Sequence, residues 1–170
     1  MKPLRLLSAL LLAAGIFPVC LSGAAGAQVG IYGGLSGAAI HSGPTPTAWG
    51  ALVGLYAQSG RNSIFGGDFR GSFVTRNGFH YNTGAIGPRV ALKLRLLPLR
   101  PYVEGLAGIA SYNSGAGTSS ATHLSYHAVV GFDWTVAPRI DWRVLDYDFS
   151  GTSGSVRANI FSTGISIRVW

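Results

Sequence analysis

Eight charged residues are the first candidates for chemistry, because they recur at alternate positions within segments that are otherwise apolar. Alternation places each of them on the face of an extended strand opposite the large apolar side chains. Four are acidic and four are basic, so a closed interior built from them would be neutral as a whole. This predicted inward-facing set comprises Asp68, Arg70, Arg89, Lys93, Glu104, Asp133, Asp141 and Arg143.

Two pairings within this set follow from folding neighbouring segments against each other. Folding the chain about Leu97 sets Glu104 close to both Arg89 and Lys93. We therefore expect one carboxylate shared between two cations on the neighbouring strand.

The next hairpin predicts a second cluster. Folding about Ala137 sets Asp133 opposite Asp141, with Arg143 diagonal to both. Two adjacent carboxylates need a cation to hold them together. Such a group could serve as a gate on a narrow ion path, or as part of a salt-bridge network that fills the interior.

The elements that must position these charges are short strands. After the first twenty residues no apolar run reaches helix-spanning length and no 3.6-residue periodicity persists, whereas alternation recurs between turn-rich segments. The predicted strands cover 28–38, 49–57, 63–73, 83–94, 100–112, 123–134, 140–149 and 159–170. Long loops are predicted at 40–48, 74–82, 113–122 and 150–155, and short turns at 58–62, 95–99 and 135–139.

One residue conflicts with this pattern. Strict alternation along 140–149 puts Asp146 on the outward, apolar face. Either a β-bulge or an early exit of this strand from the bilayer would remove the conflict.

The last strand indicates that the sheet closes on itself. Residues 159–170 have Phe161, Thr163, Ile165, Ile167 and Val169 on one face and small or polar residues on the other. In lipid every backbone N–H and C=O needs an internal partner, so this strand must pair with the first. The predicted fold is an all-β, eight-stranded, antiparallel up-and-down transmembrane β-barrel. A soluble lipocalin-like barrel is the rival, and it would turn the apolar face inward.

Aromatic residues are expected to form two girdles at the membrane interfaces. The loop-side girdle would comprise Trp49, Tyr81, Tyr112 and Tyr126. The turn-side girdle would comprise Tyr56, Tyr102, Trp134, Trp142 and Trp170.

Composition and the N-terminus fit an exported membrane protein. Charged residues make up only 11% of the chain, and the basic ones are dispersed, so nucleic acid is not an expected partner. Lys2 and Arg5 precede an apolar stretch and then small residues, which predicts a signal peptide over 1–27 and a barrel domain over 28–170. The one cysteine, Cys20, lies in the predicted signal peptide, so the barrel needs no disulfide.

The chain resembles bacterial outer-membrane β-barrels of the OmpA-like transmembrane type, with eight strands and no appended domain. The resemblance covers 28–170 and rests on the motifs Gly87-Pro88-Arg89-Val90, Arg100-Pro101-Tyr102-Val103-Glu104 and Ser162-Thr163-Gly164-Ile165-Ser166-Ile167-Arg168. It implies location in the outer membrane, contact with outer-membrane lipid, and recognition by the barrel-assembly machinery during biogenesis. The implied assembly signal comprises Ile165, Ile167, Val169 and Trp170.

An enzymatic reading rests on His123 and Ser125, which have the His-x-Ser spacing of outer-membrane lipid A deacylases, also eight-stranded barrels. A serine nucleophile needs a base and an acid that orients it. Here Tyr126 follows the serine where that family has asparagine, and the only glutamate, Glu104, lies on another strand. We therefore predict no catalytic residue.

The predicted function is a structural or surface-interaction role for a small outer-membrane barrel, with a lumen plugged by the salt-bridge network, since eight-stranded interiors are packed. The alternatives are a narrow channel with porin-like conductance and a lipid-modifying enzyme. No cofactor is expected. No metal site is expected either, because single loop histidines such as His41, His80 and His123 are usually just solvated. The surface partner of the loops is left open.

Overall fold

The computed structural model describes residues 28–41, 47–59, 63–94, 97–113 and 121–169. The predicted signal peptide over 1–27 lies outside these residues, as does Trp170 of the predicted assembly signal. Among the described residues, no helix is long and apolar enough to cross a membrane.

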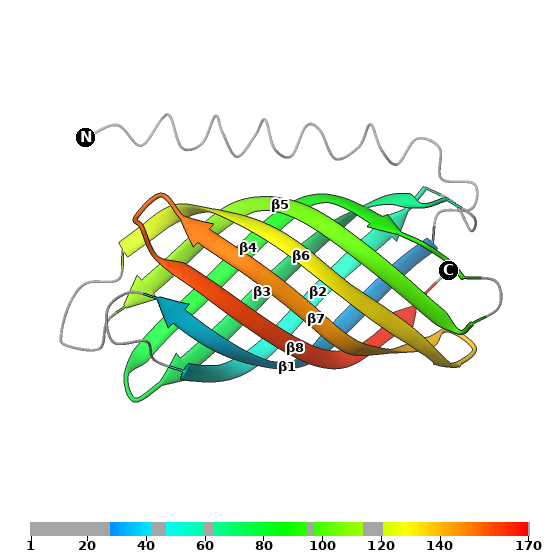
Figure 1. The fold of residues 1–170 in the computed structure, drawn as a ribbon, viewed down its shortest axis with the longest axis horizontal. Helices are drawn as coiled ribbons and strands as arrows, with labels where there is room; N and C mark the ends of the chain where they lie inside the picture. Colours follow the sequence, from blue (N-terminus) through cyan, green and yellow to red (C-terminus); the bar gives the residue numbers. More distant parts are fainter. Residues whose placement is uncertain (1–27, 42–46, 60–62, 95–96, 114–120, 170) are drawn as a thin grey trace.

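Eight antiparallel strands form one closed barrel, in which every strand pairs with its neighbours in sequence and β8 returns to pair with β1 (Figure 1). The strands are β1 (Gln28–His41), β2 (Thr47–Gln58), β3 (Phe65–Arg76), β4 (Phe79–Ala91), β5 (Leu99–Asn113), β6 (Ala121–Ala137), β7 (Ile140–Thr152) and β8 (Arg157–Arg168). The predicted fold class is confirmed. We call the end that carries the β1–β2, β3–β4, β5–β6 and β7–β8 connections the loop end, and the opposite end the turn end.

The two faces of the wall differ as the alternation predicts. Outward-facing side chains are large, apolar and exposed, as in Leu35, Phe69 and Ile165, which are 72%, 47% and 56% exposed. Inward-facing side chains are mostly polar or charged and buried. This arrangement excludes a lipocalin-like barrel, whose lumen would be apolar, and it matches a barrel that spans a bilayer.

The predicted loop 74–82 is wrong. β3 continues to Arg76 and β4 starts at Phe79, so only Asn77 and Gly78 connect them. Both have positive φ, 46° and 81°, as a two-residue hairpin turn requires. Asn-Gly between alternating segments is a strong hairpin signal, and it was available in the sequence. The expected alternation of long and short connections therefore does not hold, since the β3–β4 connection at the loop end is as short as the β6–β7 connection at the turn end, which consists of Pro138 and Arg139.

Part of the predicted girdles is also wrong. Tyr56, Tyr81 and Tyr102 are at most 2% exposed and point into the lumen, because they share the strand face of the inward charges. The exposed members are Trp49, Tyr126, Trp134 and Trp142. Tyr112 is half-buried and packs edge-on against Phe79, with ring centroids 5.1 Å apart.

A bulge in β7 explains Asp146. The pairing of β7 with β8 shifts register between Arg143 and Asp146, and the pairing with β6 shifts between Phe132 and Asp133. The extra residue reverses the alternation, so Asp146 turns inward and is fully buried. Of the two explanations offered by the sequence, the bulge is correct and the early exit from the bilayer is not.

Candidate functional site

The lumen contains every acidic residue of the chain. The six are Asp68, Glu104, Asp133, Asp141, Asp146 and Asp148, and each is at most 5% exposed. Four inward-facing arginines are also buried, namely Arg70, Arg89, Arg100 and Arg143. A fifth arginine, Arg168, is half-buried near the turn end. The exterior and both ends of the barrel therefore carry no negative side chain.

Arg70 lies at the centre of this network and is completely buried. Its guanidinium donates two hydrogen bonds of 3.0 Å to the two carboxylate oxygens of Asp146, and a third of 2.6 Å to Glu104. Asp68 and Asp148 lie at 3.7 and 3.9 Å. Such a bidentate, charge-assisted arrangement uses the planar fork of arginine and holds strands β3, β5 and β7 together.

Glu104 lies directly opposite Arg89, as folding about Leu97 predicted. The Arg89 Nη1 atom is 2.6 Å from Glu104, and its Nη2 atom is 3.1 Å from Asp133. The Arg89 guanidinium also stacks on the ring of Tyr102, 3.9 Å from the ring centroid.

The predicted contact between Glu104 and Lys93 is wrong. β4 ends at Ala91, so Lys93 lies past the end of the strand and is exposed. The second cation of Glu104 is Arg70 from β3 instead. That strand lies two positions away around the barrel, so folding β4 against β5 alone could not reveal it.

The predicted pair of Asp133 and Asp141 is wrong as well. Asp133 pairs with Arg143 across β6 and β7, and its Oδ1 atom accepts a hydrogen bond of 3.0 Å from the Arg143 Nε atom. The hairpin turns at Pro138 and Arg139 rather than at Ala137, and together with the register shift between Thr135 and Ala137 this sets Asp141 opposite Thr135.

Asp141 belongs to a separate polar group at the turn end. It accepts a hydrogen bond of 2.6 Å from Thr135, and it lies 3.0 Å from Arg168 and 3.6 Å from Arg100. No added cation is therefore needed between the two carboxylates, and the described residues contain no cluster suited to a metal ion.

The loop end of the lumen is filled differently, by apolar side chains. Ile40, Val74, Tyr81 and Ile160 are at most 1% exposed and belong to one packed cluster with the surrounding alanines. These residues come from β1, β3, β4 and β8, close to the loop-end connections. The inward face of the barrel thus carries buried charged side chains and, nearer the loop end, buried apolar ones.

Ser125 contacts His127 rather than His123, the histidine whose spacing was considered in the sequence. His127, two residues further on the same face of β6, places Nε2 3.1 Å from the Ser125 hydroxyl and Nδ1 2.9 Å from Asp148. His123 is only half-buried and lies beside Gly154. The order of contacts matches a serine–histidine–aspartate triad. The serine, however, is only 6% exposed and faces the lumen.

Several lumen residues were missed by the sequence analysis. Arg100 and His127 share the strand face of Glu104 and Asp133, so extending the alternation along β5 and β6 would have found them. Asp148 follows the β7 bulge, and strict alternation gives the wrong face there.

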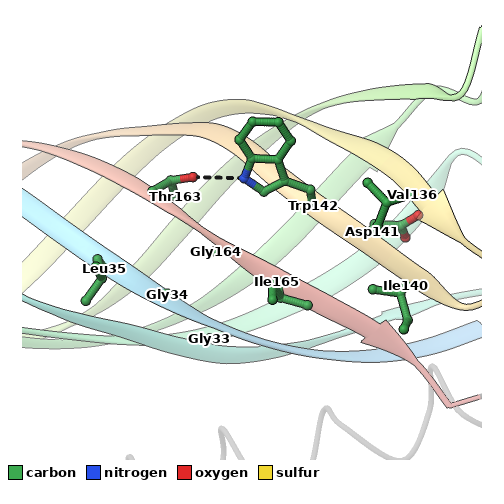
Figure 2. A pocket seen from close by; sticks show the side chains of 10 residues that line it. All are labelled: Gly33, Gly34, Leu35, Val136, Ile140, Asp141, Trp142, Thr163, Gly164 and Ile165. Carbon is green, nitrogen blue, oxygen red and sulfur yellow. Dashed lines mark hydrogen bonds between the residues drawn. The ribbon is translucent and has the colours of Figure 1, made fainter.

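The outer wall has a hollow at the seam where β1 meets β8, shown in Figure 2. Gly33, Gly34 and Gly164 lie along it, and the Trp142 indole donates a hydrogen bond of 3.2 Å to Thr163 at its edge. The predicted assembly-signal residues Ile165, Ile167 and Val169 all face outward on β8 and its extension. Their side chains are 56%, 47% and 41% exposed.

Comparisons with known proteins address the fold. No protein-family model and no curated protein sequence matches the chain. Among solved structures, Neisserial surface protein A is 17% identical, with a TM-score of 0.61, over 84% of this chain and 99% of that one. Ail, the attachment invasion locus protein of Yersinia pestis, is 14% identical, with a TM-score of 0.60 over the same shares.

A third similar structure is the N-terminal β-barrel domain of Pseudomonas aeruginosa OprF, which is 11% identical, with a TM-score of 0.54, over 82% of this chain and 97% of that one. The likeness extends over 82% to 84% of this chain and comes with low sequence identity. The chain therefore has the fold of the eight-stranded outer-membrane β-barrels, as its sequence pattern predicted.

Proposed function

We propose that this protein is a small barrel of the bacterial outer membrane with a structural or surface-interaction role and a lumen that is closed to solutes. The observation that carries the proposal is the complete burial of Arg70 on β3, whose guanidinium reaches carboxylates on β5 and on β7, the strand opposite β3 in the barrel. An ion passing along the axis would have to break these contacts. The apolar cluster around Ile40 and Val74 is a second obstacle nearer the loop end.

A planar-bilayer recording tests the closed lumen. We expect the reconstituted barrel to show no steady single-channel conductance at neutral pH, because a packed interior leaves no continuous water path. A reproducible conductance step would favour the narrow channel and contradict the plug. A known porin reconstituted in the same bilayers provides the positive control.

The surface-interaction role requires the loop end to face outside. We expect a cysteine at Ser153, which is exposed between β7 and β8, to react with a membrane-impermeant maleimide on intact cells. A cysteine at Ser59, exposed at the turn end, should react only after the outer membrane is permeabilised. Equal labelling of the two sites on intact cells would contradict this orientation.

Biogenesis fits the same proposal. Ile165, Ile167 and Val169 form a row of exposed apolar side chains along the outer face of β8, the strand that closes the barrel, and its extension. We propose that the barrel-assembly machinery reads this row.

The geometry around Ser125 makes a lipid-modifying enzyme the second candidate. The triad-like contacts favour it, but a lipid ester would have to enter the packed lumen to reach the serine hydroxyl. We propose instead that Ser125, His127 and Asp148 form a structural hydrogen-bonded group between β6 and β7.

Serine chemistry can be tested directly. We expect a fluorophosphonate probe to leave the folded barrel unlabelled, and Ser125→Ala to leave the mass of lipid A from expressing cells unchanged. Labelling that disappears in Ser125→Ala would establish the enzyme.

A further inference from the structure

Two tyrosines in the lumen each donate a short hydrogen bond to a carboxylate. The Tyr32 hydroxyl lies 2.7 Å from Asp68, and the Tyr102 hydroxyl lies 2.6 Å from Asp146. Both tyrosines are buried, at 6% and 2% exposure. A phenol that loses one electron becomes strongly acidic, so it is oxidised readily only where a base lies within hydrogen-bond reach. Tyr32 and Tyr102 both have such a base.

Tyr56 provides a comparison within the same lumen. Its side chain is only 1% exposed, but its hydroxyl has no hydrogen-bond partner among the residues that the structure describes. An oxidised Tyr56 would therefore have no nearby group to take its proton. Burial alone does not distinguish the three tyrosines, whereas the carboxylate partner does.

The guanidinium of Arg143 contacts both of the carboxylate-bonded tyrosines. Its Cζ atom is 3.8 Å from the Tyr32 ring centroid and 4.9 Å from the Tyr102 ring centroid. The two phenols are therefore linked through one planar, delocalised group. The positive charge of this group opposes a radical cation on either ring. An oxidised ring is thus stable there only as the neutral phenoxyl radical that remains after the proton has passed to the aspartate.

A path of covalent and hydrogen bonds leads from Arg143 to the lipid-facing wall. The neighbouring residue Trp142 is 48% exposed, and its indole N–H donates a hydrogen bond of 3.2 Å to the Thr163 hydroxyl (Figure 2). That hydroxyl donates a hydrogen bond of 3.0 Å to the Arg143 backbone oxygen. Trp134 pairs with Trp142 across β6 and β7 and is 41% exposed, so two indoles stand together on the outer face.

We propose that these residues form a one-electron relay that intercepts peroxyl radicals at the lipid-facing wall and stores the oxidising equivalent in the lumen. A peroxyl radical takes a hydrogen atom from the Trp142 indole N–H and becomes a hydroperoxide, which leaves an indolyl radical. One electron from Tyr102 or Tyr32 then reduces the indolyl radical, and a proton from interfacial water restores its N–H bond. The tyrosine proton passes to Asp146 or Asp68, and a neutral phenoxyl radical remains.

The inference rests on the proposed function, because the outer wall must face lipid and the closed lumen must keep solutes away from the phenoxyl radical. Trp142 is the third residue of β7, which begins at the turn end. Its indole therefore lies near the membrane interface, where water supplies the proton.

Pulse radiolysis of the barrel refolded in detergent tests the relay, with the trichloromethylperoxyl radical as the oxidant. Peroxyl radicals oxidise indoles faster than phenols, and the indolyl and phenoxyl radicals have distinct visible absorption bands. We expect the indolyl signal to decay and a phenoxyl signal to grow at the same rate, and this rate should not depend on protein concentration. The transfer should be slower in heavy water, because a proton moves with the electron. A purely structural role for the two tyrosines predicts no such effect.

Paired substitutions identify the electron donors. Tyr32→Phe combined with Tyr102→Phe keeps both rings beside Arg143 but removes both phenols, so the phenoxyl growth should be lost and the indolyl radical should live longer. The matched control combines Tyr56→Phe with Tyr126→Phe. Tyr56 is buried without a carboxylate partner, and Tyr126 is 53% exposed on the outer face. This control should transfer the electron as the unmodified barrel does.

Trp142→Phe addresses the entry point of the relay. It should lower the fraction of indolyl radicals that convert to phenoxyl radicals, because the hydrogen bond to Thr163 and the path to Arg143 are lost. Trp49→Phe is the control, since Trp49 is also exposed on the lipid-facing side but lies on β2 near the loop end. It should not lower this fraction.

Phenoxyl growth that persists in the double variant of Tyr32 and Tyr102, or a rate that rises with protein concentration, would overturn the relay. Absence of phenoxyl growth in the unmodified barrel would do the same. If the double variant does not fold, shown by an unheated gel without a fast-migrating band, the heavy-water effect and the two tryptophan variants decide. A steady conductance would contradict the closed lumen of the proposed function without changing the radical kinetics, so the two failures are distinguishable.

Discussion

Replacing Arg70 by alanine is expected to destabilise the folded barrel by about 3–5 kcal/mol, the range seen when one side of a buried ion pair is removed. Arg70 contacts Glu104 and both oxygens of Asp146, and these residues are only 5% and 0% exposed, so removing the arginine leaves buried carboxylates without this partner. Urea unfolding in detergent micelles, followed by tryptophan fluorescence, measures the effect.

A double-mutant cycle identifies the cause. Arg70→Ala combined with Asp146→Ala should cost less than the sum of the two single changes, because removing both partners leaves less unpaired charge. Lys93→Ala, at an exposed position outside the network, should change stability by no more than about 0.5 kcal/mol. If Arg70→Ala costs only about 0–1 kcal/mol and the cycle is additive, the charges are water-screened and line a pore.

Replacing Gly164 by valine is expected to prevent closure of the barrel. At this position β8 passes so close to β1 that a Cβ atom would lie 2.2 Å from the backbone oxygen of Gly33 and 2.7 Å from the Cα atom of Gly34. Backbone cannot move aside without breaking the β1–β8 ladder, and an open edge is not tolerated in lipid. We expect a loss of more than about 4 kcal/mol, seen as loss of the fast-migrating folded band on an unheated denaturing gel.

Gly105→Val is the matched control for this seam. Gly105 is exposed on β5, and nothing lies within 4 Å of the position where its Cβ would be. The change should alter stability by less than about 1 kcal/mol, the span of strand propensities. A folded Gly164→Val barrel with normal heat-dependent migration would show that the two strands can separate locally and would contradict the close approach.

The sequence alone determined the architecture and the face on which most side chains lie. Alternation has a period of exactly two residues, and lipid and lumen impose opposite demands on the two faces, so Arg70, Arg89, Glu104 and Arg143 could be assigned inward without a structure. Closure of the barrel could also be predicted from the sequence. In an open sheet the backbone N–H and C=O groups at the edge of β8 would lack hydrogen-bond partners, and lipid supplies none.

Apart from the pair of Arg89 and Glu104, only the tertiary structure decided which inward charges meet. One extra residue in β7 reverses the alternation beyond it, so Asp146 and Asp148 join the network although their sequence positions indicate the outer face. The β6–β7 hairpin turns at Pro138 and Arg139 rather than at Ala137, which gives Asp133 to Arg143 rather than to Asp141.

The contacts across the lumen were also beyond reach of the sequence. Arg70 on β3 meets Asp146 on β7, although neither strand pairs with the other in the sheet. Hairpin folding relates only neighbouring strands, whereas the distance between opposite walls depends on strand tilt and on how far the glycines let neighbouring backbones approach. Alternation along a strand therefore determines whether a side chain faces the lumen or the lipid. The geometry of the closed barrel determines which residue on another strand that side chain contacts.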